Sequence, residues 1–576
     1  MLAAAPHRGE CTTLRVIGNC VLGVANHPDT SAAAISTEAP LTAALAGHID
    51  NAVALSRELA AAGFAPATAA HADVVVAAFR KFGPEAGKHF RGCFAAILTD
   101  GASVWCFRDH AGFRPLFYRN DPGRFTAALE APQVVVGSGI TPEPDFDVLH
   151  HILYSQLPSD LPAALKGVER LAQATVLIAD LGGGVTQRRY WHPERLLETS
   201  RLSATDLKDR FDELMTQAVT RTLTGKDAIL LSGGVDSPAV AAFAATGYRE
   251  RFGRPLGAVS SVFPDLPNVD ERPYIELVAQ RFDIELHTHR PQAQPLEKLE
   301  EWTALFGTPI PTVSIPELAE SYELASRLGY RTLLTGDFAE FLFGTPMHLV
   351  SHLLTRGRWP ALIRLLATER RRGVEWRWLI GHLLTTFVPG RIANLYGQWR
   401  GHYEDRMPDW LDPQRTYRPP FRNDLLPWPW QRWRELQLMG TSGSTITLDA
   451  GEICAVRTGI DVRRPFADID LWEFFVSLRG EVKHPDIRYK TLVRGWLRGR
   501  VPDEILDRRR KTVFDDHVMA QVDYPALTRW LVGPRHRFPG IDYQRLAERI
   551  ERRDFSRFDW YWAKDLARIH AFLNAW

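Results

Sequence analysis

Short apolar runs alternate with helically spaced apolar positions through the middle of the chain. The runs at 228–231, 256–263 and 284–289 predict buried strands, and helices are expected at 238–245 and 271–282. This alternation predicts a doubly wound parallel sheet that holds its ligand at the carboxyl ends of the strands. The fold class expected for this part is therefore α/β.

The first 198 residues follow a different pattern, in which short strands lie among helices. The predicted elements are helices at 54–62 and 74–82 and a hairpin formed by 94–98 and 103–107. An apolar stripe over 203–222 then predicts a connecting helix. We expect a layered α+β domain over 1–198 and a separate α/β domain over 199–576.

Tryptophans gather in residues 345–440. Eight of the chain's seventeen tryptophans lie between Trp359 and Trp433, among arginines. Helical apolar spacing over 354–366 predicts a helical subdomain, and the prolines of 408–429 predict a loop. We therefore expect a helical insertion, whose tryptophans either line a peptide-binding surface or pack between helices.

The strand at 228–231 ends in a glycine-rich turn, SGGVDS, at 232–237. Ser237 is expected to cap the helix that follows, and the two glycines let backbone N–H groups approach an anion closely. A loop that transfers a γ-phosphate would need a lysine, which this turn lacks. The turn predicts a phosphate cradle without a lysine, against the simpler alternative of an ordinary strand-to-helix turn.

Composition narrows the class of protein. The formal net charge is +1 and 45% of the residues are hydrophobic, which argues against disorder and against a strongly basic nucleic-acid surface. The five cysteines have no CxxC spacing, so neither a disulfide framework nor a zinc site is expected. With no apolar run of bilayer length and no signal-peptide pattern, we expect a cytoplasmic protein that binds neither nucleic acid nor membrane.

The segment RDHAGFRPLFY at 108–118 is similar to the RDxxGxRPLYY element of the glutaminase domain at the front of asparagine synthetases. The resemblance extends over 1–198 and implies a domain of the Ntn (N-terminal nucleophile) type. Such a glutaminase needs a cysteine as its first residue, whereas Leu2 follows Met1 and the first cysteine is Cys11. The family's NGEIYN segment reads AGHIDN at 46–51, and Ala46 cannot donate the oxyanion hydrogen bond of the family's asparagine. We expect a degenerate amidotransferase-like fold without glutaminase activity.

The SGGVDS turn resembles the pyrophosphate-binding loop of ATP pyrophosphatases, which split ATP between its α- and β-phosphates and leave AMP on the substrate. In this resemblance Asp236 helps to hold Mg2+, and Ser232 and Ser237 donate hydrogen bonds to pyrophosphate. The residues that it implies for binding ATP and pyrophosphate are Leu230, Ser232, Gly233, Gly234, Val235, Asp236, Ser237, Ser261 and Gly336.

The segment TGDFAEFLFG at 335–344 is similar to the family's SGxGADELFGG loop. Phe338 replaces a glycine, and Glu340 stands where an aspartate usually binds Mg2+. Because Glu340 keeps a carboxylate, metal binding is expected there. Asp337 falls where family members place a group that assists the attacking amine, although a helix N-cap is the simpler alternative.

The segment GIDVRRPFAD at 459–468 is similar to the family's SVExRxPFxD run, with Asp461 in place of the glutamate. We expect Asp461 to help Asp337 to take up the amine proton. The stretches 488–499 and 501–514 resemble the KxxLRxAL, LPxEI and RxKxxF runs in the same order. Lys511 in the last run implies a positive charge on the phosphates of the adenylate, and simple solvation is the alternative for a lysine in so basic a run.

These matches identify the chain as a member of the asparagine synthetase-like family. Because the glutaminase is lost, the adenylated carboxylate must meet an amine already on the substrate or ammonia from solution. The tryptophan-rich middle is most like that of lasso peptide cyclases, which join an Asp or Glu side chain of a precursor peptide to its N-terminal amine as a macrolactam. This implies ATP and Mg2+ as cofactors, and a leader-binding protein and a leader peptidase as partners.

Two other functions stay open from the sequence. One is a small-molecule synthetase of the β-lactam type, or an ammonia-dependent asparagine synthetase. The other is a non-catalytic scaffold that binds nucleotide, against which the retention of Asp236, Glu340 and Lys511 argues.

Overall fold

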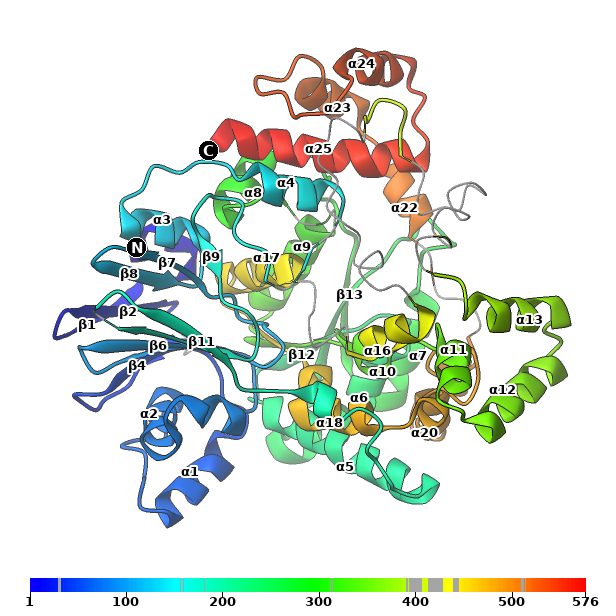
Figure 1. Ribbon diagram of the computed structural model, residues 1–576, viewed down its shortest axis with the longest axis horizontal. Helices are drawn as coiled ribbons and strands as arrows, with labels where there is room; N and C mark the ends of the chain where they lie inside the picture. The colour runs from blue at the N-terminus through cyan, green and yellow to red at the C-terminus, as the bar shows by residue number, and fades with distance from the viewer. Residues whose placement is uncertain are drawn as a thin grey trace.

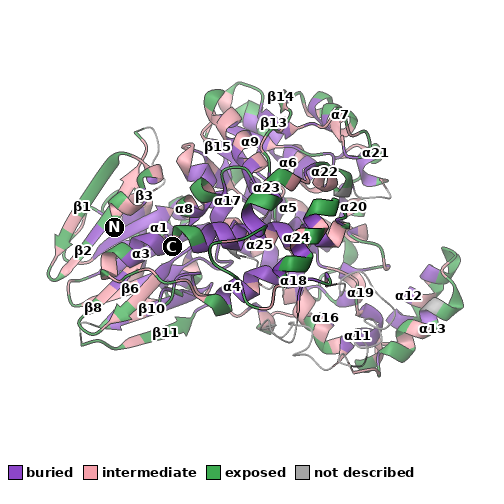
Figure 2. Ribbon diagram, turned by 90° about the horizontal axis from the view of Figure 1, so that it is seen from above, coloured by how far each residue is buried: buried purple, intermediate pink, exposed green. Residues whose placement is uncertain are grey.

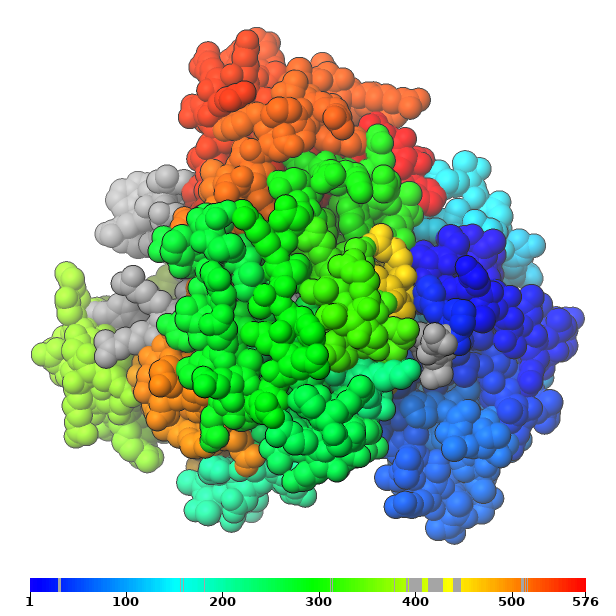
Figure 3. Space-filling view, turned by 180° about the vertical axis from the view of Figure 1, so that it is seen from behind, coloured from blue at the N-terminus to red at the C-terminus, as the bar shows by residue number. Residues whose placement is uncertain are grey.

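The chain folds around two large neighbouring sheets (Figure 1). The computed structural model describes residues 1–28, 33–155, 157–158, 160–180, 182–310, 312, 314–389, 392, 407–412, 428–438, 445–508, 512 and 514–576. Seen from behind, the N-terminal domain and the helical insertion lie at opposite ends of the molecule (Figure 3). Within the described part, the chain forms no helix long and apolar enough to cross a membrane.

The N-terminal sheet has six strands in the order β11-β10-β6-β5-β4-β3. Their bounds are β3 (Ala33–Ile35), β4 (Thr42–Gly47), β5 (Phe94–Thr99), β6 (Ser103–Arg108), β10 (Thr175–Asp180) and β11 (Val185–Arg189). The predicted hairpin is confirmed, because β5 and β6 pair antiparallel around Asp100 and Gly101. Helices α1 (Ala52–Ala61) and α2 (His71–Phe82) were both predicted; α2 packs on β4, and α1 packs on α2 (Figure 1).

Two smaller sheets complete the N-terminal domain. Strands β1 (Cys11–Ile17) and β2 (Cys20–Asn26) form a hairpin, and β7 (Phe117–Asp121) pairs with β8 (Arg124–Ala128) and β9 (Glu169–Arg170). The core of this domain continues into the next one, since one cluster of buried apolar side chains includes both Leu45 of β4 and Phe475. The division at 198/199 stays a prediction.

The second large sheet is entirely parallel, with the strand order β14-β13-β12-β15-β16. Its strands are β12 (Asp227–Leu230), β13 (Gly257–Ser261), β14 (Glu285–His289), β15 (Thr332–Leu334) and β16 (Asp461–Arg463). The predicted doubly wound parallel sheet is therefore confirmed.

Alternate residues of the central strand β12 face two different cores. Ile229 packs in the cluster that holds α5 (Ala204–Thr222) and α6 (Asp236–Phe252). Ala228 packs in the cluster that holds α9 (Ile315–Arg327), α17 (Thr445–Arg457) and α25 (Arg557–Ala575). Because both faces are covered, the strand reads as a continuous apolar run in the sequence.

The insertion contains α11 (Leu349–Thr355), α12 (Trp359–Arg371), α13 (Trp376–Thr385) and α16 (Pro429–Leu438). The helical subdomain predicted from the spacing over 354–366 is confirmed. The chain breaks at Gly357, which has a φ of +65°, and restarts with Pro360 in the first turn of α12, so this stretch is divided between two helices. Helices α12 and α13 project from the body (Figure 2). Most of the predicted loop at 408–429 lies outside the described residues.

The described tryptophans of the insertion divide into buried and exposed ones. Trp433 is buried and stacks on His352 with 3.8 Å between ring centroids, while the buried Trp410 donates a hydrogen bond to Asp559. Trp359 and Trp376 are more than half exposed. Aromatic packing is thus observed for part of the set, and a peptide-binding role stays a prediction for the rest.

Candidate active site

The SGGVDS turn joins β12 to α6 at the carboxyl edge of the parallel sheet. The Ser232 N–H donates a hydrogen bond to Ser237 Oγ at 2.9 Å, and the two hydroxyl oxygens lie 3.0 Å apart. The prediction that Ser237 caps α6 is wrong, since α6 begins at Asp236 with Val235 as its N-cap. The Ser237 hydroxyl instead closes the turn onto Ser232.

The start of α6 leaves backbone N–H groups that face the edge of the sheet where α/β proteins bind ligands. Gly336, from the loop after β15, packs directly against this helix start. A Cβ atom on Gly336 would lie only 2.6 Å from the backbone nitrogen of Ser237. Only glycine permits this approach, which brings the loop at 335–340 beside the cradle.

Glu271, which precedes α7 (Arg272–Phe282), braces the glycines of the turn from outside. Its carboxylate accepts hydrogen bonds from the Gly233 N–H at 2.9 Å, from Arg508 at 2.7 Å and from Thr512 at 2.6 Å. Arg508 also donates to the Gly233 carbonyl at 3.0 Å. The C-terminal run that contains Arg508 and Thr512 therefore reaches the predicted phosphate loop.

Lys490 is a site residue that the sequence analysis did not single out. Its Nζ contacts both carboxylate oxygens of Asp236, at 2.8 and 2.7 Å. Lys490 occupies the lysine position of the KxxLRxAL-like run, and this match is the sequence feature that could have identified it as a site residue. The structure thus places a buried positive charge beside the phosphate loop.

Glu340 lies in the first turn of α10 (Ala339–Phe343), and its backbone carbonyl accepts a hydrogen bond from the Tyr489 hydroxyl at 2.9 Å. Burial raises the pKa of Tyr489, and the negative charges of Glu340 and Asp236 raise it further. Because Tyr489 is followed by Lys490, which contacts Asp236, one short segment contacts both the start of α10 and the SGGVDS turn.

The donor set at this edge fits Mg2+. The ion prefers oxygen ligands and is commonly held by one or two carboxylates together with substrate phosphates, and Asp236 and Glu340 supply two carboxylates here. Among the described residues, no group of three or more His, Cys, Asp or Glu side chains could hold a metal without such phosphates.

Asp337 projects at the mouth of the site, where its side chain is 56% exposed. Its Oδ2 lies 3.8 Å from Nε of Arg464, a buried residue that follows β16. Asp337 does not cap α10, which was the alternative role considered for it, because the N-cap of α10 is Phe338. Phe338 has a φ of +75°, which is strained for a side chain with a Cβ and explains why the resembling loops have glycine here.

The structure does not bring Asp461 to Asp337. Asp461 pairs with Thr332 at the first rung of β16 and β15, so it lies at the amino end of the strands. Its carboxylate accepts hydrogen bonds from Arg463 at 2.6 Å and Arg114 at 3.0 Å. Burial alone would raise the pKa of Asp461, yet Arg463, His48 and Arg114 together lower it, so this carboxylate is a poor base.

Three predicted site residues remain, namely Leu230, Ser261 and Lys511. Leu230 ends β12 and Ser261 ends β13, so both lie at the carboxyl edge of the sheet. The Ser261 hydroxyl lies 3.2 Å from His289 Nε2, which also lies 2.8 Å from the Ser321 hydroxyl, in keeping with a structural role for that histidine. Lys511 lies outside the described residues.

Cys11 and Cys93 of the N-terminal domain lie in different environments. Cys11 is exposed on β1, and residues before it pack into the domain, with Ala5 and Arg8 buried and Arg8 paired with Glu130. Cys93 is buried, and burial raises the pKa of its thiol. A buried neutral thiol is unreactive.

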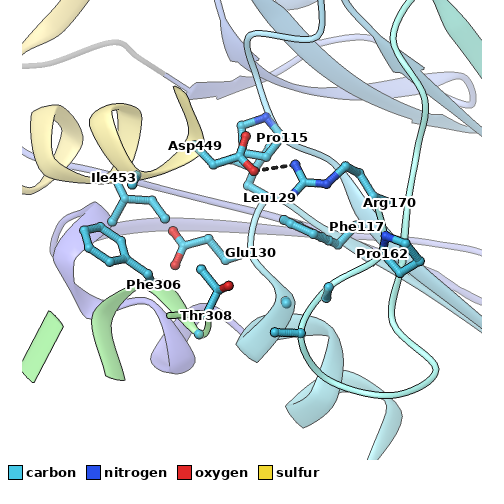
Figure 4. Close-up of a pocket in the computed structure, with 15 residues that line it drawn as sticks. Pro115, Phe117, Leu129, Glu130, Pro162, Arg170, Phe306, Thr308, Asp449 and Ile453 are labelled. Atoms are coloured by element: carbon cyan, nitrogen blue, oxygen red, sulfur yellow. Dashed lines mark hydrogen bonds and ion pairs between the residues drawn. The ribbon is translucent and has the colours of Figure 1, made fainter. Parts of the chain in front are cut away.

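A pocket with about 450 Å³ of empty space, part of it open to solvent, lies between the two domains (Figure 4). Glu130 and Arg170 line it from the N-terminal domain, and Thr308 and Asp449 from the synthetase domain. Arg170 and Asp449 form an ion pair across it. No residue of the SGGVDS turn lines this pocket, so it is distinct from the phosphate site.

Comparison with known proteins assigns each part of the chain to a family model. The asparagine synthase family model matches residues 210–573, and the glutamine amidotransferase domain matches residues 11–191. Asparagine synthetase [glutamine-hydrolyzing] 3 of Bacillus subtilis (strain 168) is 25% identical over 81% of this chain and 74% of its own length. The carboxyethyl-arginine beta-lactam-synthase of Streptomyces clavuligerus is 31% identical over 38% of this chain and 40% of its own.

Among solved structures, a glutamine phosphoribosylpyrophosphate amidotransferase from B. subtilis, complexed with ADP and GMP, covers 50% of this chain and 76% of its own. Its sequence identity is 12% and its TM-score is 0.24. The family assignment comes from the match over 210–573. The chain therefore belongs to the asparagine synthase family and is an ATP-dependent ligase that forms amide bonds.

Proposed function

We propose that this ligase closes a macrolactam on a precursor peptide, as lasso peptide cyclases do. One observation carries the proposal: Ala46 stands where the resembling glutaminases have the asparagine that donates the oxyanion hydrogen bond. A ligase of this family without its own ammonia source needs an amine from elsewhere. The N-terminal amine of the same substrate is the nearest source.

The proposed reaction begins with the acidic side chain of the peptide and ATP. The SGGVDS turn and the start of α6 would bind the pyrophosphate, with Asp236 and Glu340 holding Mg2+ against the phosphates. Mg2+ would neutralise phosphate charge as pyrophosphate leaves. Lys490 and Lys511 would stabilise the charge that develops on the α-phosphate.

The second step joins the adenylated carboxylate to the peptide's α-amine. This amine has an ordinary pKa of about 7.7–8.0, so an appreciable fraction is neutral near pH 7, unlike a lysine side chain at about 10.4. Asp337 at the open mouth of the site would orient the amine and accept its proton. Holding both ends of the peptide together makes ring closure an effectively unimolecular reaction.

The exposed aromatic surface of the insertion supports a peptide substrate. Trp359 and Trp376 are each 55% exposed, and the guanidinium group of the exposed Arg370 lies 5.8 Å from the centroid of the Trp376 ring. Tryptophan and arginine are enriched where proteins bind peptides and proteins. A leader-binding protein and a leader peptidase are the partners that this reaction implies, and we propose that it takes place in the cytoplasm.

A small-molecule synthetase of the β-lactam type is the second candidate. Its support is the 31% identity with the carboxyethyl-arginine beta-lactam-synthase, which exceeds the identity with the asparagine synthetase. An ammonia-dependent asparagine synthetase and a nucleotide-binding scaffold are weaker candidates, and the Asp236 to Lys490 pair argues against a scaffold.

Mass spectrometry separates these candidates. The purified protein is incubated with ATP, Mg2+ and a leaderless acidic peptide encoded by a neighbouring gene. Loss of one water from the peptide, with release of AMP and pyrophosphate, is the expected result. Pyrophosphate release driven by a small amino acid, with no change in the mass of the peptide, would replace the cyclase with the small-substrate synthetase.

A further inference from the structure

Charged side chains of alternating sign connect Asp337 with the N-terminal domain. Arg464 lies between two carboxylates, 3.8 Å from Asp337 Oδ2 and 3.9 Å from Glu452 Oε2. Beyond them, Arg114 pairs with both Glu452 and Asp461, and Arg463 pairs with both Asp461 and Asp50. In order of contact, this charge array consists of Asp337, Arg464, Glu452, Arg114, Asp461, Arg463 and Asp50.

The first three charges after Asp337 are buried, and the last three are half-buried. The side chains of Arg114, Glu452 and Arg464 are 2–3% exposed, against 56% for Asp337. The buried Arg464 Nε has no hydrogen-bond partner among the described residues, so its charge is balanced through Asp337 and Glu452. Because uncompensated charge is unfavourable in a low-dielectric interior, each member of the array constrains the next.

An apolar contact runs beside the array. The ring of Phe113, next to Arg114 in sequence, lies edge-on to the ring of Phe338 with 4.4 Å between centroids. Phe338 is next to Asp337 and holds the strained φ of +75°. Phe113 of the N-terminal domain therefore packs directly on the site loop, whereas the neighbouring Arg114 reaches Asp337 only through Glu452 and Arg464.

Several departures from the quoted family motifs meet at this junction. His48 and Asp50 are departures within the segment AGHIDN, and Asp461 and Phe338 are departures within the two synthetase segments. His48 Nδ1 lies 3.5 Å from Asp461, and Arg463 links Asp461 to Asp50. The altered residues thus lie close to one another or to the loop that they support, although they are far apart in sequence.

We infer that the N-terminal domain acts as a positioning element of the ligase site, with Phe113 and Arg114 holding the loop at 336–338 so that Asp337 faces the attacking amine. Adenylation uses the SGGVDS turn and does not need Asp337, whereas amine capture does. The inference rests on the proposed function, because it assigns the amine step to Asp337. It gives a domain without glutaminase activity a role in amide formation.

The test separates the two half-reactions. The variant Phe338→Gly removes the ring, while glycine adopts a φ of +75° without strain. We expect peptide-dependent ATP–pyrophosphate exchange to stay within about twofold of wild type and product formation to fall at least about tenfold, because only the second step depends on Asp337. Phe113→Ala and Glu452→Gln should give the same split.

Hydrogen exchange supplies a readout that needs no substrate. In Phe113→Ala, amides in the segment 335–343 should exchange faster than in wild type, while α6 should be unchanged. The matched control is Glu323→Gln, whose carboxylate pairs with Arg457 on the surface, and it should alter neither half-reaction. If the wild-type protein forms no product from the peptide, the proposed function is refuted, and the hydrogen-exchange measurement still tests the positioning role. Unchanged hydrogen exchange in Phe113→Ala, or equal loss of both half-reactions in Phe338→Gly, would overturn that role.

Discussion

Gly336 is the position where a single methyl group should damage the phosphate site most directly. A Cβ on residue 336 would lie 2.6 Å from the Ser237 backbone nitrogen, 2.9 Å from the Asp236 carbonyl carbon and 3.0 Å from the Asp236 Cβ. None of these atoms belongs to a flexible side-chain end. Gly336→Ala must therefore push the loop after β15 away from the start of α6.

The size of the displacement follows from these contacts. Real Cβ atoms essentially never approach within 3.0 Å, so the nitrogen at 2.6 Å and the methyl group must separate by about 0.4 Å. Overpacking of this kind costs about 1–3 kcal/mol of stability. Since a misplacement of about 1 Å in an active site lowers a rate about 100-fold, we expect an approximately tenfold fall in kcat/KM for ATP.

The assay is pyrophosphate exchange into ATP, combined with thermal unfolding. The matched control is Gly247→Ala in α6, where a Cβ meets nothing within 4 Å. Because alanine is favoured over glycine inside a helix by about 1 kcal/mol, the control should raise Tm and keep its activity. If Gly336→Ala had the same pyrophosphate-exchange rate and the same Tm as wild type, the close packing that places this loop at the phosphate site would be refuted.

Three further substitutions test other parts of the site and fold. Lys490→Met should lower pyrophosphate release about 100- to 1,000-fold, since it removes one positioned cation, and a change below fivefold would contradict the role of Lys490. Glu271→Gln should raise the KM for ATP about tenfold in the pyrophosphate-exchange assay, because it weakens three hydrogen bonds that hold the Gly233 turn. Thermal unfolding should show a melting temperature within a few degrees of wild type. Lys483, whose pKa burial lowers to about 7, binds its proton less readily in the folded than in the unfolded state, so wild-type stability should rise between pH 7 and 10. In urea titrations Lys483→Met should exceed wild type by up to about 4 kcal/mol at pH 6, with the gap closing toward pH 10, and a constant gap would count against this account.

The sequence predicts the parts of the synthetase domain whose signal is local. The strand at 228–231, the helix at 271–282 and the strand at 284–289 were all expected, and β12, α7 and β14 confirm them. Each combines an apolar run or stripe with a turn residue beside it. The fifth strand, β16, was not expected, because its three residues are Asp461, Val462 and Arg463 and its pairing with β15 is purely tertiary.

Long-range ion pairs were beyond the reach of sequence reasoning. Lys490 and Asp236 are 254 residues apart, and nothing in the pattern around either residue identifies the other. The sequence pattern likewise does not identify the pairing of Arg464, which follows β16, with Glu452 in α17. Only the folded sheet, which brings the turn after β12 beside the loop after β15, assembles these residues into one site.

The register of β16 decides which residue of the segment 459–468 serves the site. Parallel strands place ligands at their carboxyl ends, and Asp461 stands at the first rung opposite Thr332. Arg464 follows the last rung and therefore reaches Asp337, whereas Asp461 turns its carboxylate to Arg114 in the other domain. A motif match locates a segment, but a shift of three residues along a strand moves a charge from one edge of the sheet to the other. If Asp461 were the base for the amine, Asp461→Asn would abolish amide formation but leave both ATP–pyrophosphate exchange and hydrogen exchange in 335–343 unchanged. If Asp461 is instead a member of the charge array, hydrogen exchange in 335–343 should become faster in Asp461→Asn, as in Phe113→Ala.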